Sequence, residues 1–230
     1  MIISVHLPKT AGKSFQAALE TRFGDSLLED YGSFPINTPR YERQRAALEA
    51  SLSSAEADLA GVECIHGHFL PVKYLLLATR RDLTFVTWVR DPIQRLLSHY
   101  HYWRKTDQPG TAPPLRRKML EEDWSVKRFC LGDEMRNTYA QFLWAFPIEN
   151  FDFIGVTEYY EEDLAYFAER FLGVPVEPQR VNVGAAQGKE YELDAGLRRQ
   201  IEAFHERDIE LYQRALEKRQ ARRATVKIPA

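Results

Sequence analysis

Two histidines that lie two positions apart, His66 and His68, are candidates for acid–base chemistry. They belong to the run from Cys64 to Phe69, where strand alternation would place both imidazoles on one side of the chain. A neutral imidazole can accept a hydroxyl proton near pH 7, so the pair predicts a general base. Two other interpretations remain open: Cys64, His66 and His68 as zinc ligands without an evident fourth partner, or a structural pair hydrogen-bonded in the core.

A possible anion site lies near the start of the chain, where the apolar run Ile2–Val5 is followed by a glycine-containing turn and a helical pattern. Backbone N–H groups of such a turn, together with the helix N-terminus, bind anions. Lys9 and Lys13 add positive charge there, and Thr10 and Ser14 add hydroxyl donors. The segment therefore predicts a phosphate site, with an ordinary helix start carrying two solvated lysines as the plain alternative.

A second anion anchor is predicted where the strongly apolar run 83–89 meets Arg90. Arg90 would stand at the carboxyl end of a central strand, where open α/β sheets bind ligands, and its guanidinium can fork onto a phosphate. Ser98 follows about two helical turns later and could meet the same phosphate. Asp91 is expected to be the N-cap of that helix, while Arg95 could bind ligand or pair with Asp91.

The elements that must position these residues alternate between strands and helices. Strands are predicted at 2–5, 62–69, 83–89 and 151–156. After the first helix, which follows the glycine turn, helices are predicted at 43–59, 71–78, 91–104, 115–121, 125–131, 137–146, 161–172 and 194–219. This order predicts an α/β fold of three layers, P-loop-like, with a mainly parallel sheet, helices on both faces and added helices. One domain over residues 1–230 fits the length.

Composition limits the classes of partner. The formal net charge is −2, which argues against bulk affinity for nucleic acid or a membrane surface. Two cysteines without a telling spacing favour a reduced compartment, and neither a signal peptide nor a membrane-spanning stretch is evident. We therefore expect a cytoplasmic protein; oligomeric state is left open.

The segment His-Leu-Pro-Lys-Thr-Ala-Gly-Lys-Ser-Phe at 6–15 resembles the 5′-phosphosulfate loop of sulfotransferases that use PAPS (3′-phosphoadenosine 5′-phosphosulfate), especially the carbohydrate branch with heparan sulfate 2-O-sulfotransferases. Arg90 and Ser98 match the family's 3′-phosphate motif in type and spacing. The resemblance implies the family's fold and use of PAPS without a metal. The implied donor-binding residues of the loop are Lys9, Thr10, Ala11, Gly12, Lys13, Ser14 and Phe15. Lys13 departs from the family, which commonly has Thr or Ser there.

The same resemblance implies roles elsewhere. The 2-O-sulfotransferase type has a His-Gly-His between its two phosphate motifs, which implies base catalysis by His66 or His68, with His68 preferred. Lys9 would contact the leaving phosphate. Asn182 and Lys189 match a late segment that closes over the donor. The segment 137–141 lacks an arginine that the family usually has there.

The predicted activity is therefore in-line transfer of a sulfuryl group from PAPS to an acceptor hydroxyl, with a sugar favoured. The basic residues around 104–105 and 116–118 could hold an acidic acceptor. The Walker A loop of nucleotide kinases is the nearest rival: Gly12-Lys13-Ser14 matches its end, but Leu7 stands where its first glycine belongs. A kinase using ATP with Mg²⁺ and a non-catalytic module that binds anionic glycans remain alternatives.

Overall fold

Five parallel strands form the central sheet of the computed structural model, which describes residues 1–32, 38–105, 113–177 and 191–225. The strands are β1 (Ile2–Val5), β2 (Leu27–Asp30), β3 (Cys64–Gly67), β4 (Thr84–Val89) and β5 (Phe153–Val156). They pair in the order β2-β3-β1-β4-β5, every neighbour parallel. The predicted α/β class with a parallel sheet is confirmed.

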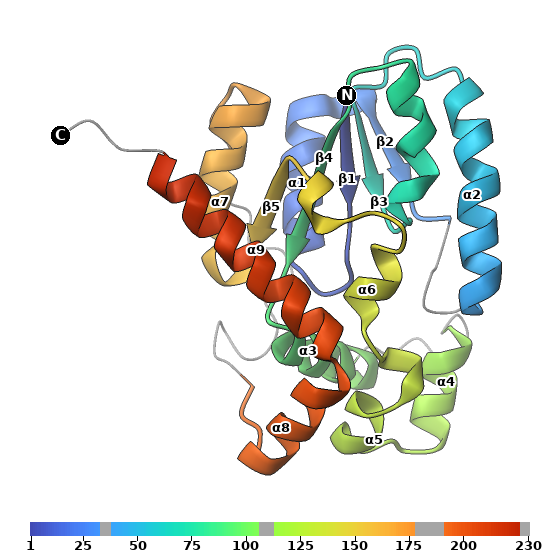
Figure 1. Ribbon diagram of the computed structural model, residues 1–230, viewed down its shortest axis with the longest axis vertical. Coiled ribbons are helices and arrows are strands. Elements are labelled where there is room, and N and C mark those ends of the chain that lie inside the picture. Colours follow the sequence, from blue (N-terminus) through green and yellow to red (C-terminus); the bar gives the residue numbers. More distant parts are fainter. Residues whose placement is uncertain (33–37, 106–112, 178–190, 226–230) are drawn as a thin grey trace.

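Helices fill the connections between the strands and the region after β5 (Figure 1). The α-helices are α1 (Gly12–Phe23), α2 (Arg40–Glu56), α3 (Pro92–Lys105), α4 (Pro114–Glu121), α5 (Val126–Cys130), α6 (Thr138–Phe142), α7 (Tyr160–Phe167), α8 (Ala195–Phe204) and α9 (Glu206–Thr225). The shorter or tighter helical turns are η1 (Gly24–Ser26), η2 (Pro71–Thr79), η3 (Asp133–Met135), η4 (Ile148–Asn150), η5 (Thr157–Tyr159) and the π-helical η6 (Ala168–Leu172).

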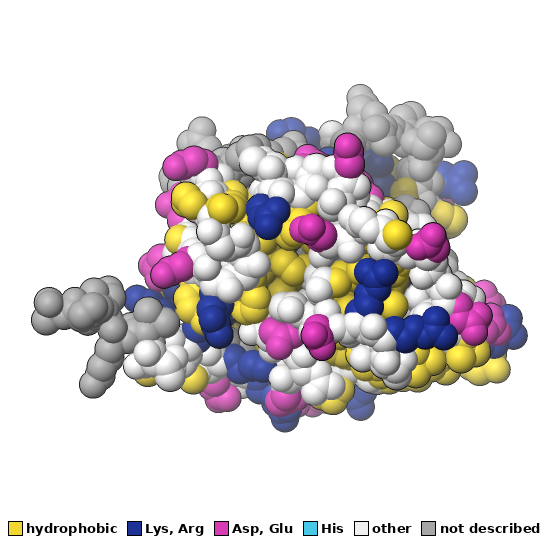
Figure 2. All heavy atoms as spheres, turned by 90° about the horizontal axis from the view of Figure 1, so that it is seen from above, with side chains coloured by type: hydrophobic (Ala, Val, Ile, Leu, Met, Phe, Trp, Pro, Cys, Tyr) yellow, Lys and Arg dark blue, Asp and Glu magenta, His cyan; other side chains and the backbone are white. Residues whose placement is uncertain are grey.

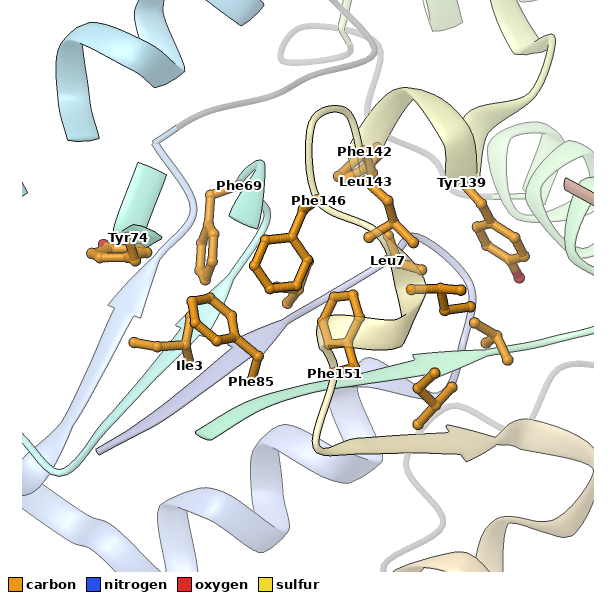
Figure 3. Close-up of a cluster of buried hydrophobic side chains, with 14 of the residues drawn as sticks. Ile3, Leu7, Phe69, Tyr74, Phe85, Tyr139, Phe142, Leu143, Phe146 and Phe151 are labelled. Atoms are coloured by element: carbon orange, nitrogen blue, oxygen red, sulfur yellow. The ribbon is translucent and has the colours of Figure 1, made fainter. Parts of the chain in front are cut away.

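Apolar side chains cover both faces of the sheet. On one face α1 and α7 pack against the strands, and Phe15 and Phe167 meet Trp88 and Phe153 there. On the other face a larger cluster draws on η2, α6, α9 and the turns before β5, with aromatic rings gathered over the strands (Figure 3). Burial on both faces explains why these strands read as apolar runs instead of alternating ones.

The carboxyl ends of the strands point toward a separate helical layer. The strand arrows run toward α3, α4, α5 and α8 (Figure 1), which share a core around Leu96, Phe129 and Ile201. The opposite end of the molecule, seen from above, carries basic and acidic side chains interspersed, and no histidine of the described residues is visible on that face (Figure 2). The loops that follow the carboxyl ends of the strands, which carry the predicted site residues, therefore lie between the sheet and the helical layer.

Two elements differ from the sequence prediction. The edge strand β2 was missed because its four residues, Leu-Leu-Glu-Asp, are half exposed and show no apolar alternation. The single long helix predicted over 194–219 is wrong: α8 ends before His205 and α9 begins after it. His205 is fully buried there, its Nε2 lies 2.7 Å from the Cys130 carbonyl, and its Nδ1 accepts from Asn137 N–H.

Asp163 on α7 holds α9 against the edge of the sheet. Its carboxylate accepts hydrogen bonds from Arg219 Nε (2.9 Å) and Arg222 Nη2 (2.7 Å) of α9, and from the backbone N–H of Val156 in β5 (2.8 Å). The Asp163 side chain is 3% exposed and that of Arg219 5%. A buried pair of this kind is costly to break from one side, because the partner left behind keeps its charge.

Asp163→Ala should therefore lower the free energy of unfolding by about 3–5 kcal/mol, measured by urea denaturation. Glu49→Ala is the matched control, because it removes the carboxylate of an exposed ion pair with Arg45. We expect that control to change stability by less than about 0.5 kcal/mol. Equal losses in the two variants would contradict the anchoring role of Asp163.

Candidate active site

The predicted site residues meet where β1, β3 and β4 end. His6 follows β1, His68 follows β3 and Arg90 follows β4, and these three strands are adjacent in the sheet. His6 and Arg90 are more than 80 positions apart in the sequence, and the parallel register brings all three residues to one edge of the sheet. This is the position at which open α/β sheets bind ligands.

The turn between β1 and α1 is shaped by two residues with left-handed backbone. Lys9 has φ 67° and Ala11 has φ 62°. Ala11 is the N-cap of α1 without a side-chain cap, and the first helical bond runs from Phe15 N–H to Ala11 O at 3.1 Å. The N–H groups of Gly12 and Lys13 precede that bond, so they lie at the positive end of the helix. This is the anion-binding geometry that the sequence predicts.

Gly12 is required by a close approach. A Cβ at this position would lie 1.7 Å from Nε2 of His6, well inside van der Waals contact. His6 in turn is held by Tyr31, whose hydroxyl donates to Gln16 Oε1 (3.2 Å) and lies 3.0 Å from His6 Nδ1. The Tyr31 hydroxyl therefore accepts from Nδ1–H of His6, which leaves Nε2 of that ring unprotonated beside Gly12.

Three cations converge at the turn. Burial, followed by the charges of Arg90 and Lys13, lowers the pKa of Lys9 to about 8. The Lys9 ammonium also lies 4.0 Å from the centre of the Tyr102 ring. Within the described part of the chain, neither lysine nor Arg90 has a carboxylate at ion-pair distance. Positive charge gathered without a carboxylate in direct contact favours an anionic ligand, while the Glu158 carboxylate interacts with Arg90 at longer range.

Three imidazoles stack beside these cations. The ring of His6 lies between those of His66 and His68, with centroids 5.2 Å and 4.2 Å apart. His66 is 1% exposed, its Nδ1 lies 2.8 Å from Ser4 Oγ, and burial lowers its pKa to about 3. His66 is therefore neutral and lies beneath the other two rings, away from the surface.

His68 is the histidine best placed to act as a base. Its Nδ1 lies 2.5 Å from the carbonyl oxygen of His6, which can only accept, so Nδ1 carries the proton. The lone pair of the neutral ring is therefore on Nε2. Burial lowers the pKa of His68 below its ordinary value of 6.5, which keeps the ring neutral at pH 7. His68 is also less buried than His66.

The start of α3 places Arg90 and Ser98 on one segment. Asp91 Oδ1 accepts from Gln94 N–H at 2.9 Å, so the N-cap prediction for Asp91 is confirmed. Ser98 is partly exposed, two turns along the helix. Arg95 does not pair with Asp91, because its buried guanidinium donates to Thr138 Oγ1 at 3.1 Å.

Two of the predicted donor contacts in the loop, Phe15 and Thr10, have side chains that are engaged inside the protein. Phe15 is 1% exposed and packs against Trp88, and its N–H is used within α1, so it supports the loop from the core instead of contacting a ligand. Thr10 is fully buried, and its hydroxyl donates to Leu7 O at 2.8 Å, so this side chain shapes the turn. Asn182 and Lys189 lie outside the described residues.

The metal interpretation of the histidine strand finds no support in the geometry. Cys64 packs into the apolar cluster on the α1 face, and burial raises its pKa to about 12. Over residues 1–32, 38–105, 113–177 and 191–225 there is no group of three His, Cys, Asp or Glu side chains that could hold a metal ion. Over the same residues, no helix is long and apolar enough to cross a bilayer.

Sequence reasoning missed two contributors to the site, Tyr31 and Tyr139. Tyr31 fixes the orientation of His6 from a segment that reads as loop, and no sequence pattern marks it. Tyr139 contacts the backbone of Arg90 through its hydroxyl. Tyr139 lies within the segment 137–141 that lacks the family's arginine, and the sequence gives no sign of its link to the residue after β4.

A hollow of about 790 Å³ lies on the side of the helical layer, between the start of α2 and the helices α4, α6 and α9. Its charged lining comprises Arg40, Arg43, Lys118, Asp133, Glu134, Arg136, Glu206 and Arg207. Gln141 belongs to the same lining, accepts from the Arg43 guanidinium, and precedes Phe142, whose ring centre is 6.2 Å from that of His68. The basic segment 116–118 contributes only Lys118, because Arg116 is buried and donates to Trp103 O.

No family model and no curated protein matches the sequence. Among solved structures, a sulfotransferase domain from the curacin biosynthetic pathway matches over 88% of this chain and 96% of its own, with 13% identity and a TM-score of 0.37. A sulfotransferase from Alicyclobacillus acidocaldarius matches over 91% of this chain and 92% of its own, with 14% identity and a TM-score of 0.46.

Proposed function

We propose that the chain is a sulfotransferase that moves the sulfuryl group of PAPS to a hydroxyl of an acceptor, with a carbohydrate as the preferred class. The observation that carries the proposal is the convergence of Lys9, Lys13 and Arg90 around a helix N-terminus, next to a neutral His68 whose Nε2 is free of a proton. A donor with two separate anionic groups and an acceptor hydroxyl needs both features.

Two segments of the chain divide the donor between them. The N–H groups at the start of α1, with Lys9 and Lys13, are suited to the 5′-phosphosulfate. Arg90 and Ser98, which enter from β4 and α3, are suited to the 3′-phosphate. An ATP site does not need this second anchor. Asn182 and Lys189 remain proposed donor contacts on the resemblance alone.

In the proposed reaction, His68 Nε2 takes the proton of the acceptor hydroxyl as the new S–O bond forms. The bond between sulfur and the 5′-phosphate oxygen breaks on the opposite side. Lys9 and the loop amides stabilise the negative charge that develops on that oxygen. His66, buried beneath the stack, supports His6 and His68 instead of meeting the acceptor. We propose that the lysines supply the charge for which kinases use Mg²⁺, so no metal takes part.

Donor class is tested by thermal unfolding with PAP (3′-phosphoadenosine 5′-phosphate), the product of the transfer. At about 100 times its Kd a ligand adds about 2.7 kcal/mol of stability, so PAP should raise the Tm by several degrees with EDTA present. ATP with Mg²⁺ should give a smaller shift. The reverse ranking would favour the kinase alternative, and no shift with either would favour a binding module without a nucleotide.

Catalytic roles are tested by turnover of PAPS. Lys9→Ala and His68→Ala should each lower kcat by about 10²–10⁴-fold, since general bases and charge stabilisers act in that range. Lys127→Ala on the exposed face of α5 is the control and should retain activity. Unchanged rates in either variant would remove that residue from the mechanism.

The pH dependence of the wild-type enzyme tests the same two groups. At pH values below 6.5, kcat/KM should decrease as His68 gains a proton, and at pH values above about 8 it should decrease as Lys9 loses one.

We further propose that the hollow between α2 and α4 holds an acidic sugar acceptor, because five cations and three carboxylates line it. Its lining residue Gln141 directly precedes Phe142, whose ring centre lies 6.2 Å from that of His68. Arg40→Gln with Lys118→Gln should raise KM for an acidic oligosaccharide about tenfold and leave the Kd of PAP unchanged, because each rim charge contributes modestly. Lys127→Gln, outside the hollow, is the matched control. An unchanged KM in the double variant would place the acceptor elsewhere.

A further inference from the structure

The Tyr139 hydroxyl forms hydrogen bonds with both the N–H and the C=O group of Arg90. It donates to Arg90 O at 2.8 Å and accepts from Arg90 N–H at 2.9 Å. β4 ends at Val89, so Arg90 has left the sheet and its backbone no longer belongs to a ladder of strand hydrogen bonds. The ring of Tyr139 is fully buried. One side chain from α6 thus replaces the strand partners that Arg90 lacks.

Tyr139 is itself fixed from two other helices. The Asp208 carboxylate of α9 accepts from the N–H groups of Tyr139 (3.1 Å) and Ala140 (3.0 Å) at the start of α6. The Arg95 guanidinium of α3 lies 5.5 Å from the centre of the Tyr139 ring and donates to Thr138 Oγ1. Figure 3 shows Tyr139 at the margin of the core cluster beside Leu7, with its hydroxyl directed away from Phe146 and Phe151.

The hydrogen bonds from Tyr139 are important because the Arg90 side chain lies near another cation, Lys9. Its charge lies close enough to Lys9 to lower the pKa of that ammonium, so the two cations repel each other. Within the described part of the chain no carboxylate lies at ion-pair distance to hold the guanidinium against that repulsion. The Glu158 carboxylate interacts with Arg90 at longer range. The two hydrogen bonds of Tyr139 restrain the Arg90 backbone, from which that side chain extends.

We propose that Tyr139 is the positioning residue through which the chain recognises the 3′-phosphate of its donor, and so distinguishes PAPS from nucleotides that carry only a 5′-group. This inference rests on the proposed function, because it assigns the 3′-phosphate to Arg90. Tyr139 touches no part of the donor. It acts by holding Arg90, which makes the two residues one unit in binding.

Tyr139→Phe keeps the ring and removes both hydrogen bonds, which makes it the direct test. By calorimetry, the Kd of PAP should rise roughly tenfold, because an Arg90 that is no longer restrained makes a weaker contact with the 3′-phosphate. The Kd of AMP, which lacks the 3′-phosphate, should stay within about twofold. In an Arg90→Ala background, adding Tyr139→Phe should change the Kd of PAP by less than about twofold. Both substitutions act through the contact between the Arg90 guanidinium and the 3′-phosphate, which Arg90→Ala has already removed.

Tyr100→Phe is the matched control. It removes another buried tyrosine hydroxyl of the helical layer, one that donates to Trp124 O at 3.1 Å, and it should leave the preference for PAP over AMP unchanged. A Tyr139→Phe protein that keeps the full preference overturns the inference. An equal loss of PAP and AMP affinity overturns it too, since that pattern indicates general damage.

The wild-type protein tests the proposed function separately from the role of Tyr139. A wild-type protein that binds AMP as tightly as PAP refutes the proposed donor, whatever Tyr139 does. If Tyr139→Phe does not fold, Asp208→Asn tests the same link, because it weakens the hold on the start of α6. That variant should lower the preference for PAP in the same direction, and an unchanged preference counts against the role of Tyr139.

Discussion

Repulsion between like charges is the constraint that the rest of this structure must satisfy. Lys9, Lys13 and Arg90 occupy one small region, and the pKa of Lys9 is lowered to about 8, first by burial and then by the charges of Arg90 and Lys13. Two unit charges about 8 Å apart repel by about 2 kcal/mol at an effective dielectric constant of about 20. The fold holds these three cations together, and an anion bound between them would relieve their repulsion.

Rigid attachments on every side resist that repulsion. Lys9 lies on a turn with left-handed backbone at two non-glycine residues, a conformation that costs about 1–2 kcal/mol per residue and must be stabilised by its surroundings. Beneath the turn, Phe15 and Leu7 bury their side chains in the two cores. On the far side, Tyr139 holds Arg90 and Asp208 holds the start of α6. The buried polar groups of the helical layer thus serve the geometry of the charged site.

The parts of the site that sequence reasoning located are those with a local signature. Lys9, Gly12 and Lys13 share one short turn before a helix, and Arg90 follows an unmistakable apolar strand, so their types and spacing are informative. Strand order was not readable, because the edge strand β2 is short and half exposed. The roles of Tyr31 and Tyr139 depend on contacts with residues 25 and 49 positions away, and a single tyrosine carries no mark of such a partner. The break at His205 is likewise set by Cys130 and Asn137, both distant in sequence.

Because Gly12 and His6 are in close contact, substitutions at these two positions are not independent of each other. Because the imidazole occupies the space of a Cβ, position 12 cannot gain a side chain while His6 stays where it is. A lineage that lost the histidine would free position 12 to drift, and one that gained a residue there would have to surrender the histidine stack first. The glycine at position 12 is therefore explained by the imidazole in front of it, since the left-handed residues of the turn are Lys9 and Ala11.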